Sequence, residues 1–420
     1  MTHTPPDPLH LAVALNDAGW HPAAWREPDA QPDRLFTPGY WTDLARQAER
    51  GLLDFVTIED GLDLQSDSHF AKDERTDRVR GRLDAVLIAS RIAPKTRGIG
   101  FVPTVITSHT EPFHISKSVA TLDYVSTGRA GVRVQVGARA DTASHFGRRT
   151  DFQTSTGDPI DPARREDLDV RKIIADRFDE AADYVEVVRR LWDSWEDDAE
   201  IRDVATGRFI DREKLHYIDF EGTYFSIRGP SVTPRPPQGQ PVVAALGHAS
   251  VPYQLIARAA DVGFVTPRGR TSAAGIVAEI RAEQETAGRG GETIHVFGDL
   301  VVFLDDTAGQ ARARREHLDE RAGTEYHSDA YIFAGTAAEL ADLLLDWREA
   351  GLSGFRLRPA ALPHDLTQIT ESLVPELRRR EAFRTAYPAD GPGAGTLRGL
   401  LGLPRPANRY AAATVNAGTT

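Results

Sequence analysis

The chain has no cysteine and a single methionine among its 420 residues. Without cysteine there can be no disulfide bond, no thiolate catalysis and no cysteine-ligated metal, and the composition is compatible with the cytoplasm. No apolar run is long enough to span a bilayer, and the opening MTHTPPDPLH lacks the basic and apolar regions of a secretory signal. We therefore expect a cytoplasmic protein with no membrane partner.

Excess positive charge and metal-binding spacings are also missing. The formal net charge is −12, whereas nucleic-acid-binding proteins neutralise phosphates with basic patches, so we expect no nucleic-acid partner. The 13 histidines show no HxH or HExxH spacing, so we expect no metal site. No GxSxG elbow, P-loop or GxGxxG turn occurs in a suitable context, which argues against serine hydrolases and classical nucleotide folds.

What recurs instead is a short apolar run, most often ending in a polar residue or glycine. Near-continuous apolar strands of this kind fit a parallel sheet covered on both faces, and most of the intervals carry a helix-like pattern. Eight such units predict an α/β fold, a closed (β/α)8 TIM barrel, whose active site lies at the C-terminal strand ends. The runs are Leu9–Asn16, Asp54–Asp60, Gly98–Ile106, Ala130–Val136, Pro241–Leu246, Val262–Val265, Ile294–Leu304 and Gly354–Pro359.

The longest interval predicts an insertion between strands 4 and 5, at about 138–240. An alternating segment around Glu221 and Gly222 within it predicts a β-hairpin. An amphipathic helix is also predicted there, over Ile173–Trp195, with its buried face formed by Phe178, Ala182, Val185, Val188 and Trp192.

One barrel domain is expected over residues 1–388. Residues 389–420 are rich in glycine and proline, which predicts an extended C-terminal tail packed on the barrel or on a partner subunit, with the last ten residues disordered.

Two strand ends carry candidate functional residues. Glu59 and Asp60 are adjacent and so point to opposite sides of their strand, which excludes a glycosidase-type acid pair. Asp60 either faces the barrel mouth or forms a cap or ion pair at the surface. The turn Gly247–Ser250 (GHAS) opens a helix and is either a phosphate site built from free N–H groups or an ordinary loop with Ser250 as N-cap.

Several longer segments resemble the bacterial luciferase-like flavin monooxygenases. The likeness runs in order over nearly the whole chain, and is greatest to the branch of nitrilotriacetate monooxygenase, pristinamycin synthase and dibenzothiophene sulfone monooxygenase. The segments that carry it are GWHPAAWR, TLDYVSTGRAG, RFDEAADYVEVVRRLWDSW, FEGTYFSIRGP, PRPPQGQPVV, GFRLRPAALPHDL, VPELRRR and LRGLLGLPRPANRY.

The resemblance implies a homodimeric TIM-barrel oxygenase that uses oxygen and reduced FMN, supplied by a separate flavin reductase, to oxidise a small organic substrate. It also implies that Asp60 and Thr104 line the isoalloxazine, with Thr104 beside the atoms that react. The phosphate turn matches Gly247, His248 and Ala249, with Ser250 one place along.

The chain departs from the family pattern at several cofactor positions. Arg133 stands where the branch has an asparagine, and Ile174 and Phe178 stand where it has a histidine and a tyrosine. Arg133 either enters the pocket, as a cofactor-binding and catalytic residue, or points outward to an acid of the insertion. Phe178 is expected at the cofactor. Two alternatives follow from the altered pocket: a deazaflavin-dependent dehydrogenase, and a non-catalytic or sensory flavin-binding homologue.

Overall fold

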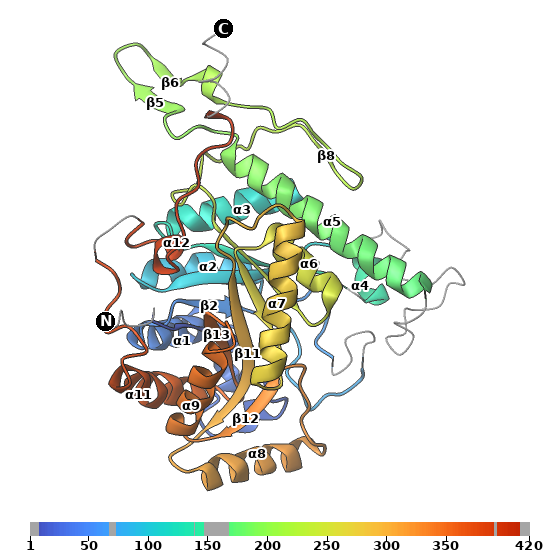
Figure 1. Ribbon diagram of the computed structural model, residues 1–420, viewed down its shortest axis with the longest axis vertical. Coiled ribbons are helices and arrows are strands. Elements are labelled where there is room, and N and C mark those ends of the chain that lie inside the picture. Colours follow the sequence, from blue (N-terminus) through green and yellow to red (C-terminus); the bar gives the residue numbers. More distant parts are fainter. Residues whose placement is uncertain (1–7, 67–72, 138, 147–167, 390–392, 412–420) are drawn as a thin grey trace.

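The computed structural model describes residues 8–66, 73–137, 139–146, 168–389 and 393–411. Eight parallel strands form a closed barrel in the order β10-β9-β4-β3-β2-β1-β13-β11, and pairing of β10 with β11 completes the ring (Figure 1). The predicted TIM barrel is therefore confirmed, with one strand from each of the eight apolar runs. The strands are β1 (His10–Leu15), β2 (Phe55–Ile58), β3 (Gly100–Ile106), β4 (Gly131–Gln135), β9 (Val242–Gly247), β10 (Val262–Val265), β11 (His295–Leu304) and β13 (Gly354–Pro359).

A ninth strand of this sheet, β12 (Tyr331–Gly335), is not foreseen by the sequence analysis. The ten residues of β11 pair with β10 through their first half, and Leu300–Leu304 then pair with β12. Because most of β12 is only half-buried, it lacks the continuous burial of the barrel strands.

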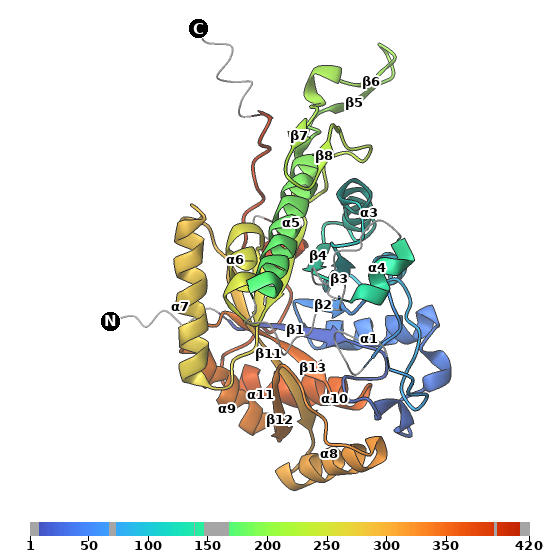
Figure 2. The ribbon, with the colours of Figure 1, turned by 90° about the vertical axis from the view of Figure 1, so that its right-hand side faces the viewer.

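Helices surround the barrel (Figure 2). α5 (Leu168–Asp193) packs against α3 and α6, so the predicted insertion supplies one helix of the outer ring. Four of its five predicted core residues are buried, and Phe178 is half-buried. The other long helices are α1 (Pro38–Arg50), α2 (Ala85–Ile92), α3 (Pro112–Val125), α6 (Ser250–Ala259), α7 (Arg270–Thr286), α8 (Ala308–Ala322) and α9 (Ala337–Arg348), and the shorter ones are α4 (Ala140–Phe146), α10 (His364–Gln368) and α11 (Val374–Arg379).

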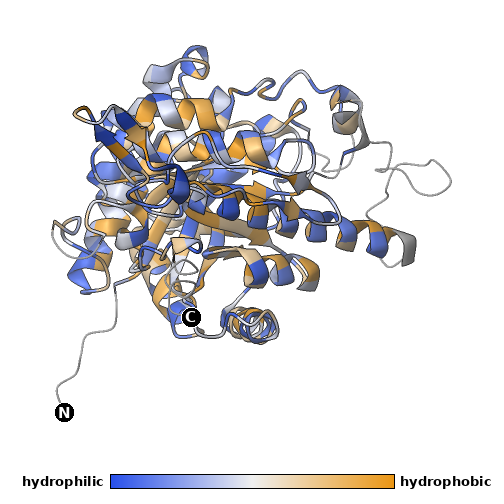
Figure 3. Cartoon of the chain, turned by 90° about the horizontal axis from the view of Figure 1, so that it is seen from above, coloured by the Kyte–Doolittle hydropathy of each residue, from blue (hydrophilic) through white to orange (hydrophobic). Residues whose placement is uncertain are grey.

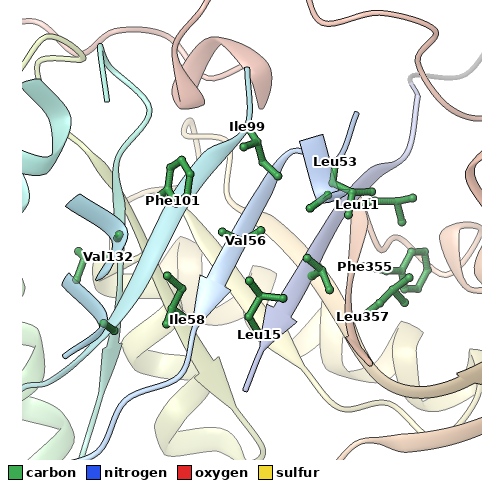
Figure 4. Close-up of a cluster of buried hydrophobic side chains, with 14 of the residues drawn as sticks. Leu11, Leu15, Leu53, Val56, Ile58, Ile99, Phe101, Val132, Phe355 and Leu357 are labelled. Carbon is green, nitrogen blue, oxygen red and sulfur yellow. The ribbon is translucent and has the colours of Figure 1, made fainter. Parts of the chain in front are cut away.

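The main core lies between the strands and the helix ring. Seen from above, apolar residues gather inside and hydrophilic ones on the outer helix faces (Figure 3). Leu11, Val56, Phe101, Val132 and Phe355 are at most 2 % exposed and come from neighbouring strands (Figure 4). Burying large aliphatic and aromatic side chains of this kind stabilises a fold by about 1.5–3 kcal/mol each.

Two antiparallel hairpins follow α5. β7 (Phe220–Glu221) pairs with β8 (Ser226–Ile227), which confirms the hairpin predicted around Glu221 and Gly222. The other hairpin, formed by β5 (Glu200–Asp203) and β6 (Arg208–Ile210), projects from the body (Figure 1). None of the described helices has the length and apolarity needed to cross a membrane.

The C-terminal tail packs against the N-terminal end of the barrel of its own chain. Short α12 (Leu397–Leu400) places Leu397 and Leu401 in an apolar cluster with Phe55, Phe264 and Phe297. A Cβ atom on Gly100 would lie 2.7 Å from the Leu397 side chain, so Leu397 can seat only above a glycine. The predicted disorder of the last ten residues falls outside the described residues except for Ala411.

Truncation of Leu397 tests how much the tail stabilises the barrel. Because this side chain is fully buried, we expect Leu397→Ala to lower the free energy of unfolding by about 2–5 kcal/mol. Urea unfolding followed by circular dichroism measures the loss. Leu87→Ala is the control, since Leu87 is 69 % exposed and should change stability by less than about 0.5 kcal/mol. Equal stability of the two variants would show that burial of Leu397 does not stabilise the barrel.

Candidate active site

The apolar cluster around Phe55, Phe264 and Phe297 fills the N-terminal end of the barrel, and the interior becomes polar towards the C-terminal strand ends. Inward-facing positions alternate along each strand, so the apolar or glycine positions Phe55, Val102, Gly131 and Phe297 are each followed, two residues on, by a polar one. The resulting set is nearly all fully buried and lies towards the C-terminal strand ends. It consists of Thr57, Glu59, Thr104, Arg133, Asp299, Arg356 and Arg358.

Arg133 points into this polar layer. Its Nε donates to Thr104 Oγ1 at 2.9 Å, and its Nη2 donates to Glu59 Oε2 at 2.5 Å and to Gln135 Oε1 at 2.8 Å. The outward reading, in which Arg133 pairs with an acid of the insertion, is therefore wrong. The strand register decides the direction, because Arg133 pairs with Thr104 across β3 and β4 and both face inward.

Thr104 and Arg133 both keep hydrogen-bond donors free. The Thr104 hydroxyl accepts from Arg133, and no described residue accepts its proton although the side chain is 1 % exposed. Likewise, no described residue accepts from Arg133 Nη1. Polar groups inside a barrel normally have partners, so this edge of the barrel is suited to a ligand acceptor.

Two more arginines share one buried acid on the opposite wall. Arg356 donates to Asp299 through Nε at 2.9 Å, and Arg358 donates to the same carboxylate through Nη2 at 2.6 Å. Burial opposes ionisation of Asp299, but the two guanidinium groups outweigh it and hold its pKa below the usual range. Arg358 also contacts Asp329, at 2.6 Å.

Asp60 faces away from this network. Its Oδ1 accepts from Gly61 N–H at 2.7 Å and its Oδ2 from Ala85 N–H at 2.8 Å, at the start of α2. Glu59 points inward, so the two side chains lie on opposite sides as expected. Burial raises the pKa of Asp60 to about 6, although both backbone N–H groups oppose that shift. Each oxygen keeps a lone pair for a ligand, and a flavin contact by Asp60 stays a prediction.

The turn after β9 lies next to the polar layer. Gly247 ends β9 and has no room for a side chain, because a Cβ would lie 2.8 Å from the Tyr253 ring. His248 is 3.1 Å from Thr266 Oγ1 and 3.4 Å from Asp329 Oδ2. The N-cap of α6 is Ala249, with no side-chain cap bond, and Ser250 is the first helical residue. The reading of Ser250 as N-cap is therefore wrong, because the helix begins one residue earlier than expected.

One further predicted residue lies outside the polar layer. Phe178 is half-buried and packs against the main hydrophobic core from α5. The middle of the predicted insertion, residues 147–167, lies outside the described residues.

A comparison with known proteins gives the family. The sequence pattern of the luciferase-like monooxygenase family matches residues 18–354. The chain belongs to this family. It is 30 % identical to N-acetyl-S-(2-succino)cysteine monooxygenase of Bacillus subtilis, over 96 % of this chain and 98 % of the relative. It is also 28 % identical to nitrilotriacetate monooxygenase component A of Aminobacter aminovorans, again over 96 % and 98 %.

A solved structure of riboflavin lyase, containing modified FMN and riboflavin, superposes with a TM-score of 0.79 at 26 % identity. The alignment covers 97 % of this chain and 99 % of that one. The predicted flavin-dependent monooxygenase family, and with it an enzyme, is thus confirmed.

Three residues of the site escaped the sequence analysis: Glu59 as an inward residue, Asp299 and Arg356. The signal was present, because charged residues inside otherwise apolar parallel strands are almost never fully buried unless paired. IHVFGDLVVFL contains one acid, and GFRLRP contains two arginines two residues apart. What was missing was the partner of each charge, which lies far away in the sequence.

The described residues fit a flavin of this family. The free Thr104 hydroxyl proton and Arg133 Nη1 suit the carbonyl and nitrogen acceptors of an isoalloxazine ring. The α6 N-terminus, uncapped by any side chain, offers backbone N–H groups for a phosphate.

The raised pKa of Asp60 predicts a pH-dependent stability. The folded protein holds a proton at Asp60 up to about pH 6, whereas the unfolded chain releases it near 3.8. The stabilisation that protonated Asp60 contributes is therefore present at low pH. It is lost as the pH rises from 3.8 to about 6, and the free energy of unfolding falls by up to about 3 kcal/mol. We expect Asp60→Asn to remove this fall, measured as the difference from wild type in unfolding free energy at pH 4.5 and 6.5. Asp84→Asn keeps a side-chain cap on α2 (2.8 Å from Asp84 Oδ1 to Leu87 N) and should retain most of the fall, because burial raises the pKa of Asp60 more than the Asp84 charge does.

Proposed function

We propose that this chain is the oxygenase component of a two-component system that binds reduced FMN and oxidises a small organic substrate with oxygen. Reduced FMN, when bound, would supply the two electrons that activate oxygen, so that one oxygen atom is transferred to the substrate and the other leaves as water. The proposal extends the family assignment to a cofactor and to named residues. It is supported by the pair of relatives whose names describe monooxygenases, one of them as component A.

The observation that carries the proposal is the free donor edge formed by Thr104 and Arg133. Both groups are buried, both are held by the same 2.9 Å hydrogen bond, and both face inward near the C-terminal strand ends. Donors fixed before the ligand arrives cost no reorganisation when charge develops beside them. We assign them to the isoalloxazine, with Thr104 beside the reacting atoms.

Arg133 favours the reduced cofactor in particular. Burial lowers its pKa to about 10, so the guanidinium stays protonated at neutral pH. Among the described residues its one close acid is Glu59, whereas Arg358 is held between Asp299 and Asp329. Arg133 is therefore the least neutralised of the three interior arginines. A reduced flavin carries negative charge over N1 and the C2 carbonyl when ionised, and a guanidinium fork suits that edge.

Gly247, His248, Ala249 and Ser250 would hold the FMN phosphate. The N–H groups at the start of α6 can donate to an anion, and so can the ring N–H of the exposed His248. Asp60 and the half-buried Phe178 are proposed to line the flavin. A flavin reductase supplies the cofactor, and we propose a homodimer as in the family.

An anaerobic titration tests the cofactor. We expect tight binding of reduced FMN, weaker binding of oxidised FMN and no preference for reduced deazaflavin, all followed by flavin absorbance and fluorescence. Oxygen consumption with a reductase and candidate substrates then tests turnover. Exclusive binding of the deazaflavin would replace the oxygenase by a dehydrogenase, and absence of all flavin binding would favour a non-catalytic homologue.

His248→Ala tests the phosphate turn separately from the ring site. Loss of a charge-assisted contact predicts an affinity for FMN about tenfold weaker, while affinity for riboflavin, which has no phosphate, changes less than about twofold. His216→Ala is the control, because His216 is also partly exposed and pairs with an acid, Glu196, at 2.8 Å. Equal weakening of FMN and riboflavin by His248→Ala would contradict a phosphate role.

A further inference from the structure

The polar layer of the barrel is one continuous chain of alternating charges. From Arg133 it passes to Glu59 at 2.5 Å, from Glu59 to Arg356 at 3.4 Å, and from Arg356 to Asp299 at 2.9 Å. From Asp299 it continues to Arg358 at 2.6 Å, to Asp329 at 2.6 Å and to His248 at 3.4 Å. The chain therefore joins the Thr104–Arg133 donor edge to the turn after β9.

Asp299 is the central member of this chain. Its carboxylate is fully buried and takes hydrogen bonds from both Arg356 and Arg358. Each of these arginines also lies over an aromatic ring, with Arg356 Cζ 4.3 Å from the Phe264 ring centre and Arg358 Cζ 4.5 Å from that of Trp20. Both guanidinium groups are thus fixed in place from two sides.

We propose that Asp299 is a positioning residue for the flavin site: by holding Arg356, it leaves Glu59 to Arg133 and so aims Arg133 and Thr104 at the cofactor. This inference rests on the proposed function, since it assigns a role in the same site. Asp299 itself touches neither Arg133 nor Thr104.

Competition for Glu59 explains how the effect is transmitted. Glu59 pairs with two arginines: it contacts Arg133 most closely and also lies 3.4 Å from Arg356. If the Asp299 charge is removed, Arg356 is left buried without its main anion, and an unpaired buried charge is strongly unfavourable. The nearest remaining acid is Glu59. Arg356 then attracts Glu59 away from Arg133. The Arg133 guanidinium thereby loses its ion pair with Glu59, which holds its Nε against Thr104.

Asp299→Asn tests the proposal through flavin binding. We expect affinity for reduced FMN to fall by at least about tenfold. Riboflavin should be affected to the same degree, because the ring site changes while Arg358 keeps Asp329 and the phosphate turn stays in place. The absorption spectrum of bound oxidised FMN should shift towards that of free flavin. Asp299→Glu, which restores the charge, should recover part of the affinity.

The barrel offers a matched control at its other end. Asp261 is also buried and shared by two arginines, Arg189 at 2.9 Å and Arg398 at 3.3 Å, but it anchors the tail. Asp261→Asn should destabilise the fold by a comparable amount and leave flavin affinity within about twofold. Glu59→Gln tests the same chain at a residue nearer the rim, in case Asp299→Asn does not fold, and should weaken reduced FMN several-fold.

A double-mutant cycle with Arg133→Met shows whether Asp299 acts through Arg133. If it does, Asp299→Asn has little further effect on flavin affinity in the Arg133→Met background. Additive losses, or a wild-type affinity and spectrum in both Asp299→Asn and Glu59→Gln, would overturn the inference while leaving the proposed function intact. A wild-type protein that binds no flavin overturns the proposed function, and this inference with it.

Discussion

The upper half of this barrel depends on keeping buried charge in balance. Three arginines, Arg133, Arg356 and Arg358, face three acids, Glu59, Asp299 and Asp329, and the first five of these side chains are nearly or fully buried. Moving an ion out of water costs several kcal/mol unless a close partner offsets it, so none of these side chains can be placed independently of the others. The strand register sets which side chains face the mouth, and the charge balance then decides which partner each of them takes.

A buried ion-pair network is a poor means of stabilisation, because well-packed apolar residues often serve as well or better. The lower half of the same barrel uses that alternative. Phe55, Phe264 and Phe297 form an apolar layer there, which the tail closes with Leu397 and Leu401. The contrast fits a division of labour in which the N-terminal end of the barrel stabilises the fold and the C-terminal end holds the ligand.

Arg133 can be understood in this setting. It brings a full charge into the interior and therefore requires Glu59 beside it. Glu59 is its only close acid among the described residues, so Arg133 is less neutralised than Arg358. In the flavin site proposed above, Arg133 therefore sets the local charge as well as supplying a hydrogen bond.

The sequence by itself determined the eight barrel strands, the hairpin around Glu221 and the family, because short apolar runs and local motifs are set by residues close together in the chain. It could not determine β12, which is half-buried, or the packing of the tail residue Leu397 against Gly100. Nor could it determine the direction of Arg133 or its pairing with Glu59, 74 residues away. Asp299 and Arg356 are likewise 57 residues apart. Closure of the barrel alone brings these charges together, and burial then forces them to pair.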